Sequence, residues 1–228
     1  MIQRQLLGTA PIPGGEELRL FAHGRDFMIV LGRNELMSTR MRGSEEALAR
    51  LTLDRLDGLR DPHLLIGGYG MGFTLRAALA GLGPKGRITV AELVPEIVEW
   101  ARGPMAGLTA GCLDDPRVTL TLRDVGELIL LSPQAYDAIL LDVDNGPDGL
   151  VREDNERIYA RDGLRAAKDM LNPGGVLAVW SAERDPKFTR RLEKTGFAVE
   201  EVEVRARIGA DGKGKGPRHT IWFARKAG

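Results

Sequence analysis

Downstream of residue 62, short apolar runs alternate with longer segments in which apolar residues recur every three or four positions. The runs have the length of buried strands, whereas the longer segments have the spacing of one helix face. The predicted strands lie at residues 63–68, 87–93, 117–122, 136–144 and 176–181. The predicted helices lie at residues 74–82, 95–103, 124–131, 163–171 and 186–196. This alternation predicts an α/β fold with a doubly wound, mostly parallel sheet.

Both ends of the chain have a different pattern. Residues 197–207 and 219–226 alternate polar with apolar positions, which predicts a closing antiparallel hairpin. Near the start, residues 19–23 and 27–32 flank the turn sequence HGRD and predict a second hairpin. Ser44 is expected to cap the helix that follows it. We therefore divide the chain into a small N-terminal β-hairpin element, residues 1–43, and a Rossmann-like domain, residues 44–228.

The composition and the lengths of the apolar runs argue against several functional classes. Lys+Arg and Asp+Glu are both 32, so the net charge is zero, and we expect no nucleic-acid partner. No apolar run is long enough for a transmembrane helix or a signal peptide, so we expect no membrane contact and a cytoplasmic location. Cys112 is the single cysteine, which excludes an intramolecular disulfide, and no metal site is expected.

A glycine-rich turn follows the first predicted strand of the domain. Gly68, Gly70 and Gly72 form G-x-G-x-G, and glycines let a ligand approach the backbone closely. A dinucleotide fingerprint needs a further glycine where Phe73 stands, so the motif points away from NAD. For the motif itself, a plain tight turn is the alternative. Tyr69, inside the turn, is expected to cover the ligand or only to pack on a neighbouring helix.

Acidic residues end the next two predicted strands. Glu92, followed by Leu93, has the distance from the glycines that suits a carboxylate accepting hydrogen bonds from ribose hydroxyls. Asp124, followed by Val125, is placed to accept from the amine of an adenine, or only to cap the next helix. Because the three features end successive strands, we predict a nucleoside site formed by these residues and the glycine turn.

The fourth predicted strand ends in Asp142, Asp144 and Asn145. Two carboxylates and an amide suit a sulfonium, an amine substrate or general-base catalysis, while a polar turn is the alternative. We predict Asp142 and Asp144 as catalytic residues and Asn145 as a substrate contact. Asn155 and Tyr159, further along, are expected to reach the substrate. Trp180, at the end of the fifth strand, is expected to border the pocket.

The segments LLIGGYGMGFTLRAAL, VAELVPEIVEWARG, LRDV, YDAILLDVDNGP and NPGGVLAVWS resemble the spermidine synthase-like branch of the S-adenosylmethionine-dependent Rossmann-fold proteins. The resemblance implies the methyltransferase type of sheet. It implies that Gly68, Gly70, Glu92 and Asp124 hold the nucleoside and that Asp142 deprotonates an attacking amine. The implied ligands are S-adenosylmethionine, its decarboxylated form or methylthioadenosine. A small-molecule acceptor and a homodimer are also implied.

The chain departs from that family around the acceptor. Its glycine turn contains no acidic residue, and Asn145 takes the place of an aspartate. A gap-free alignment puts Glu35 on the family's glutamine, Arg40 and Met41 on its acidic pair, and residues 44–46 on its Tyr-His-Glu run. Arg40 is therefore expected at the acceptor, where an arginine suits a neutral or anionic group better than a diamine.

Three functions follow from these observations. The preferred interpretation is a transferase that moves the methyl group of S-adenosylmethionine to an undetermined small molecule, because the glycine turn lacks an acid. The alternative is a spermidine synthase-like aminopropyltransferase that uses decarboxylated S-adenosylmethionine. A third interpretation is a nucleoside-binding module without catalysis.

Overall fold

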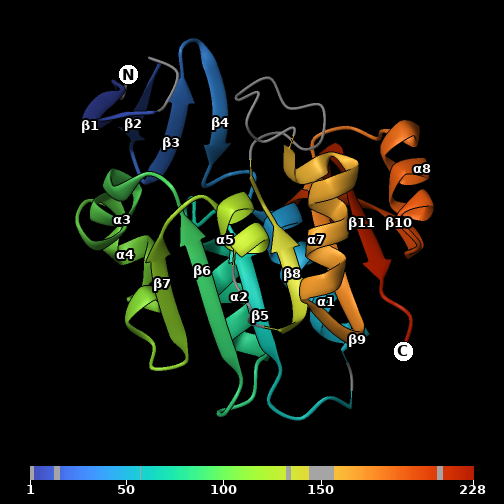
Figure 1. Ribbon diagram of the computed structural model, residues 1–228. Helices are drawn as coiled ribbons and strands as arrows, with labels where there is room; N and C mark the ends of the chain where they lie inside the picture. The colour runs from blue at the N-terminus through green and yellow to red at the C-terminus, as the bar shows by residue number, and fades with distance from the viewer. Residues whose placement is uncertain (1–2, 13–15, 57, 132–134, 144–156, 210–212) are drawn as a thin grey trace.

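The computed structural model describes residues 3–12, 16–56, 58–131, 135–143, 157–209 and 213–228. They form two sheets, one of four antiparallel strands and one of seven strands (Figure 1). The strands of the first sheet, in the order β1-β2-β3-β4, are Gln5–Pro11, Glu17–His23, Asp26–Leu31 and Asn34–Ser38. The predicted hairpin is its central pair, β2 and β3, and the sequence analysis missed both outer strands.

The larger sheet has the strand order β10-β11-β9-β8-β5-β6-β7. Its strands are β5 His63–Gly67, β6 Arg87–Glu92, β7 Val118–Leu122, β8 Tyr136–Leu141, β9 Leu171–Ser181, β10 Ala198–Ile208 and β11 Gly214–Arg225. The strands from β9 to β7 along this order are parallel, and β11 is antiparallel to both of its neighbours. The expected Rossmann-like sheet of methyltransferase type, with its C-terminal hairpin, is confirmed.

Helices cover both faces of this sheet (Figure 1). Their bounds are α1 Gly43–Arg55, α2 Phe73–Gly81, α3 Pro95–Arg102, α4 Ala106–Thr109, α5 Val125–Leu131, α7 Arg161–Met170 and α8 Pro186–Lys194, with a 3-10 turn η1 at Cys112–Asp114. The side chains of neighbouring residues in a strand lie on opposite faces of the sheet. Leu64 and Ile66 pack with residues of α1, α2 and α3, while Leu65 packs with residues of α5, α7 and α8. In the part of the chain that the structure describes, no helix is long and apolar enough to span a bilayer.

The start of α1 differs from the prediction. Arg42 occupies the N-cap position, and no side chain there forms a capping hydrogen bond. Ser44 lies inside the helix and is fully buried, and its Oγ is 2.8 Å from His219 Nδ1. The hydroxyl therefore joins α1 to β11, and this tertiary contact replaces the cap that local sequence suggested.

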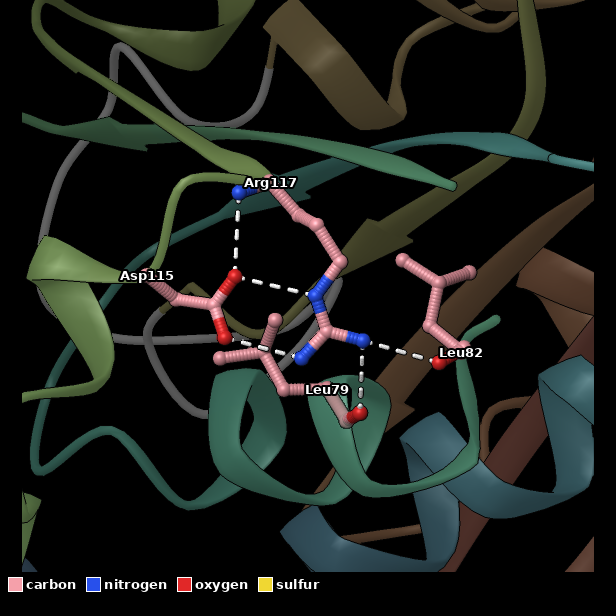
Figure 2. Close-up of polar contacts among 4 residues, drawn as sticks. All are labelled: Leu79, Leu82, Asp115 and Arg117. Atoms are coloured by element: carbon pink, nitrogen blue, oxygen red, sulfur yellow. Dashed lines mark hydrogen bonds and ion pairs between the residues drawn. The ribbon is translucent and has the colours of Figure 1, made fainter. Parts of the chain in front are cut away.

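Arg117, in the loop before β7, joins that loop to the C-terminal end of α2 (Figure 2). Its Nη1 donates to the carbonyl oxygens of Leu79 at 3.2 Å and Leu82 at 2.8 Å. Its Nε and Nη2 donate to the two carboxylate oxygens of Asp115, at 2.9 and 2.8 Å. The guanidinium thereby satisfies carbonyl groups that a helix end leaves without partners. It also lowers the pKa of the Asp115 carboxyl to about 2.

Candidate functional site

The register of the larger sheet brings three predicted site residues to one level. Gly67 on β5 pairs with Ala91 on β6 and with Leu141 on β8. The next residues along these strands are Gly68, Glu92 and Asp142. Since β5 is the strand at which the chain changes direction across the sheet, these residues lie at the switch point, where open α/β sheets bind ligands.

A cavity of about 1040 Å³, counted to its open mouth, lies at these strand ends. The four-stranded sheet contributes apolar side chains to its wall, among them Leu18, Ile29, Leu36 and Met37. Figure 1 shows this sheet beyond the carboxyl ends of the larger sheet's strands. Of the predicted nucleoside-site residues, Gly68, Gly70, Glu92, Leu93, Asp124, Val125 and Asp142 line the cavity. That each of them contacts a ligand stays a prediction.

Two glycines form the floor of the cavity through their backbone. Gly68 has φ of +85°, and a Cβ there would lie 2.5 Å from the carbonyl oxygen of Asp142. Gly70 has φ of +54°, and a Cβ there would lie 2.9 Å from Met37 Sδ. Any side chain at these positions would be strained and would push the chain into its neighbours.

Glu92 is buried, with 5% of its surface exposed, and it accepts hydrogen bonds from the glycine turn. Oε2 accepts from the Tyr69 backbone N–H at 2.9 Å, and Oε1 accepts from the Val94 N–H at 2.9 Å. Burial raises the pKa of the Glu92 carboxyl, and the hydrogen bonds from these N–H groups oppose that rise. Each oxygen has a second lone pair, so the carboxylate is held in place and can still accept from a ligand hydroxyl.

Asp124 caps the start of the helix that follows it, α5. Its Oδ1 accepts from the backbone N–H groups of Gly126 at 2.7 Å and Glu127 at 3.3 Å, at the start of α5. The capping role that the sequence analysis kept as an alternative is therefore present. Because Asp124 also lines the cavity, its contact with an adenine stays a prediction beside that role.

Asp142 follows β8 directly and is partly buried at the cavity wall. Thr74, in the first turn of α2, donates from Oγ1 to Asp142 Oδ2 at 2.6 Å. Burial raises the pKa of the Asp142 carboxyl to about 6, against the lowering effect of the Thr74 hydrogen bond. A carboxyl with that pKa is ionised near neutral pH and still binds a proton readily, which suits a general base.

Glu45, in the first turn of α1, lines the same cavity. Burial raises the pKa of its carboxyl well above the ordinary value, and the negative charge of Asp142 raises it further. Sequence reasoning treated Glu45 as part of a helix start. The signal that could have identified it was its place in the stretch aligned with the Tyr-His-Glu run of the resembling family, of which this chain keeps only the glutamate, at Glu46.

The charged residues of the largely apolar cavity wall are mostly acidic. Its acidic residues are Glu45, Glu92, Asp124 and Asp142, and among the described lining residues Arg123 is the only basic one. Such a wall favours a cationic ligand and disfavours a carboxylate. No group of histidine, cysteine or acidic residues in the described parts of the chain is arranged to hold a metal ion.

Four predicted residues are not among those that line the cavity: Tyr69, Gly72, Tyr159 and Arg40. The Tyr69 hydroxyl is 3.4 Å from Cys112 Sγ, and its ring packs against Gly72 at the start of α2. The Tyr159 hydroxyl donates to the Val143 carbonyl at 3.4 Å, and its ring lies edge-on to Phe188 in the core. For Tyr69, only the backbone N–H approaches the site, through Glu92.

Arg40 lies on the outer side of the four-stranded sheet. Its Nη2 is 2.7 Å from Asp26 Oδ2, in an exposed ion pair beside a separate surface hollow. This ion pair lowers the pKa of the Asp26 carboxyl. Arg40 therefore lines this hollow and not the cavity, and its contact with an acceptor stays a prediction. Asp144, Asn145 and Asn155 lie outside the described residues.

Three residues in or beside the cavity come from elements whose role the sequence analysis did not foresee. Met37 belongs to a missed strand, while Thr74 and Glu45 stand in helix first turns. No local motif marks them, since only packing brings them to the strand ends. Trp180, which was expected to border the pocket, does line the cavity.

The family model of the spermine/spermidine synthase domain matches residues 45–194. Polyamine aminopropyltransferase 2 of Pseudomonas aeruginosa is 34% identical over 124 residues, which are 53% of this chain and 33% of that protein. The polyamine aminopropyltransferase of Mycobacterium tuberculosis is 32% identical over 126 residues, which are 54% of this chain and 23% of that protein. The matched segment thus spans a third or less of each relative.

Solved structures agree on the fold. The spermidine synthase from Thermotoga maritima has a TM-score of 0.74 at 18% identity, covering 98% of this chain and 73% of that one. A spermidine synthase in complex with the transition-state analogue AdoDATO has a TM-score of 0.73 at 18% identity, with the same coverage. A methyltransferase-like structure from Thermoplasma acidophilum has a TM-score of 0.53 at 22% identity, covering 75% of this chain and 70% of that one.

The preferred expectation of methyl transfer is wrong. The matching family model and the curated relatives are those of aminopropyltransferases, which was the stated alternative. The expectation rested on the absence of an acid from the glycine turn. In the structure α1 supplies an acid, Glu45, to the cavity that also holds Asp142. Two carboxyl groups there disfavour the carboxylate of S-adenosylmethionine and suit an ammonium group.

Proposed function

The chain belongs to the spermine/spermidine synthase domain family, and on that premise we propose that it transfers an aminopropyl group from decarboxylated S-adenosylmethionine to a small-molecule amine. The observation that carries this proposal is the pair of carboxyl groups, Glu45 and Asp142, in a cavity whose remaining wall is largely apolar. A homodimer and a cytoplasmic location accompany the proposal as what the resemblance suggests.

The reaction needs few groups from the protein. The amine nitrogen attacks the carbon next to the sulfonium, the new C–N bond forms as the C–S bond breaks, and methylthioadenosine leaves as a neutral thioether. The nitrogen loses one proton, which Asp142 accepts. Thr74 holds that carboxylate by the 2.6 Å hydrogen bond, so most of the rate would come from positioning.

The residues at the other end suit the nucleoside. Glu92 is oriented by backbone N–H groups and keeps lone pairs for ribose hydroxyls. Gly68 and Gly70 leave room where a Cβ would meet other atoms, so the donor can lie on the backbone. The acidic wall attracts a donor that carries a sulfonium and an ammonium and lacks a carboxylate.

The direct test is a product assay with the purified chain. Decarboxylated S-adenosylmethionine and 1,4-diaminobutane should yield methylthioadenosine together with an aminopropylated amine. S-adenosylmethionine in place of its decarboxylated form should yield neither aminopropylated nor methylated product. Asp142→Asn should lower kcat by roughly 10²- to 10⁴-fold, the usual effect of losing a general base.

The matched control is Asp162→Asn, an exposed aspartate on α7, which should keep full activity. Binding of methylthioadenosine without any turnover would favour the non-catalytic nucleoside module instead. If neither decarboxylated S-adenosylmethionine nor methylthioadenosine bound, the proposal would be overturned.

A further inference from the structure

In the part of the chain that the structure describes, the side chain of Trp180 carries a buried hydrogen-bond donor without a partner. Its side chain is 8% exposed, and within the described residues its Nε1 has no hydrogen-bond partner. The ring lies edge-on to His219, with centroids 4.8 Å apart at an angle of 82°. His219 is itself held by Ser44, at 2.8 Å between Nδ1 and Oγ. The indole is therefore held against His219, and Trp180 is also one of the residues that line the cavity.

The sheet places Trp180 beside the proposed base. Val179 on β9 pairs with Leu141 on β8, in parallel register. Trp180 and Asp142, one residue further along each strand, thus stand on neighbouring strands at the same level. Glu92 is the last residue of β6. This strand is separated from β9 by β8 and β5, or about 14 Å at the usual spacing between strands. Trp180 therefore lies at the end of the cavity remote from the nucleoside residues.

A buried N–H without a partner is rare in folded proteins and destabilising, so each case needs a physical explanation. Trp222, on the neighbouring strand β11, shows the ordinary arrangement in this molecule. It is fully buried in the core, and its Nε1 donates to Thr189 Oγ1 at 2.9 Å. Trp180 differs because the space it borders is the cavity, where a ligand atom can accept the hydrogen bond.

We propose that the Trp180 N–H binds the acceptor substrate and selects an amine whose far end presents an uncharged lone pair. This inference rests on the proposed function, since it takes the end of the cavity beyond Asp142 as the acceptor's place. An indole N–H is a donor only, and an ammonium group has no lone pair to offer it. A fully protonated alkane diamine therefore leaves the indole unsatisfied, whereas a hydroxyl oxygen or an uncharged amine nitrogen satisfies it.

The test measures binding of three amines of equal length to the protein saturated with methylthioadenosine, by calorimetry. They are 4-aminobutan-1-ol, 1,4-diaminobutane and 1-aminopentane, which has a methyl group in place of the distal polar atom. The wild-type protein should bind 4-aminobutan-1-ol roughly 5- to 50-fold more tightly than 1-aminopentane, the range for one buried hydrogen bond. Trp180→Phe, which keeps a ring and removes the N–H, should abolish this preference.

The pH dependence of amine binding distinguishes the two possible sources of the lone pair, a hydroxyl oxygen and an uncharged nitrogen. A hydroxyl oxygen does not titrate, so preference for 4-aminobutan-1-ol over 1-aminopentane should be constant between pH 7 and 10. If an uncharged nitrogen is the natural partner, binding of 1,4-diaminobutane should strengthen over the same range relative to 4-aminobutan-1-ol. Trp222→Phe is the matched control and should leave all preferences unchanged, because its N–H is already paired inside the protein.

The inference is overturned if Trp180→Phe weakens the binding of all three amines equally. It is also overturned if the wild-type protein binds 4-aminobutan-1-ol no more tightly than 1-aminopentane, or if no amine binds. Trp180→Leu replaces the phenylalanine variant if the latter does not fold. Because the measurement needs no turnover, it is independent of the transfer assay. A retained preference without aminopropyl transfer would contradict the proposed function and leave the role of Trp180 standing.

Discussion

The proposed function of Asp142 and its burial make opposing demands on one carboxyl group. As the proposed base it must be ionised near neutral pH, whereas a partly buried carboxyl resists ionisation, which is why its pKa rises to about 6. Thr74 moderates this conflict with a hydrogen bond to Oδ2 that favours the charged form. The pKa of the Glu45 carboxyl is also raised, first by its burial and then by the negative charge of Asp142. Burial thus acts on both of these acids, which line the same cavity.

We expect the turnover rate to follow the ionisation of Asp142. Below pH 6 the base becomes protonated, so kcat at saturating amine should fall by about tenfold for each further pH unit. The measurement is kcat for methylthioadenosine release between pH 5 and 8. Asp142→Asn should show a low rate without this acid limb, and a wild-type kcat that stays level down to pH 5 would contradict the prediction.

The ionised Asp142 carboxyl should lower the free energy of unfolding. The pKa of Asp142 is about 6 in the folded protein and ordinarily 3.8, so between these values the folded state binds more protons than the unfolded state. The free energy of unfolding therefore falls as pH rises through this window and stays lowered above it. Asp142→Asn should raise the free energy of unfolding at pH 8 by on the order of 1 to 3 kcal/mol.

Urea denaturation at pH 8 and pH 4 measures this effect. The gain should shrink toward pH 4, where the Asp142 carboxyl of the folded wild-type protein is almost fully protonated and neutral. A variant less stable than the wild-type protein at pH 8 would show that the Asp142 charge stabilises the folded protein.

At the scale of elements, the four-stranded sheet forms the outer wall of the site. Met37 on β4 lies against Gly70 and lines the cavity. Met37→Ala should weaken methylthioadenosine binding by roughly 3- to 30-fold, because apolar contacts over the nucleoside are lost. Leu6→Ala is the control, since Leu6 is on β1 of the same sheet but 51% exposed. Equal affinities of Met37→Ala and wild-type protein, measured by calorimetry, would exclude this sheet from the donor site.

The loop before β7 holds the C-terminal end of α2 through one guanidinium (Figure 2). Arg117→Lys keeps the charge but cannot donate to Asp115, Leu79 and Leu82 together, because an ammonium lacks the planar fork of donors. We expect Tm to fall by roughly 2–6 °C. Arg102→Lys, in the exposed ion pair with Asp114, should leave Tm nearly unchanged. Equal melting temperatures of the two variants would contradict the helix-end role.

At the scale of the whole molecule, the cavity borders the same cluster of buried side chains that forms the core between the two sheets. One cluster of buried side chains joins Leu20 and Ile29 of the four-stranded sheet to Leu48 of α1 and Ile66 of β5. The cavity opens between this cluster and the strand ends, so a ligand there contacts both sheets. Ligand binding and folding should therefore be coupled.

Saturating methylthioadenosine, at about 100 times its Kd, should raise Tm by roughly 5–10 °C. Thermal unfolding with and without the ligand measures this shift. Adenosine 5′-monophosphate should produce a smaller shift, because its phosphate would approach the acidic wall formed by Glu45 and Asp142. A larger shift with the monophosphate would mean that the far end of the cavity selects anions.

Sequence patterns predicted most of the strands and helices, because each pattern depends on residues that are close together in the chain. Buried strands and helix faces have fixed periods, so the core strands of the larger sheet and their order of appearance were predictable. The carboxyl ends of parallel strands meet at one edge, which made Gly68, Glu92 and Asp142 predictable as neighbours. The outer strands β1 and β4 were missed because edge strands carry few apolar residues, and their partners are set by pairing.

By itself the sequence determined the larger sheet and the residues Gly68, Glu92 and Asp142, which we propose as nucleoside contacts and base, since each stands at the end of a strand in the chain. Only the tertiary structure decided which other side chains surround Asp142. Ser44 left its expected cap for His219, Arg40 turned outward to Asp26, and Glu45 and Trp180 met Asp142 from a helix start and a neighbouring strand. These placements depend on how distant segments pack, and side-chain periodicity contains no information about that.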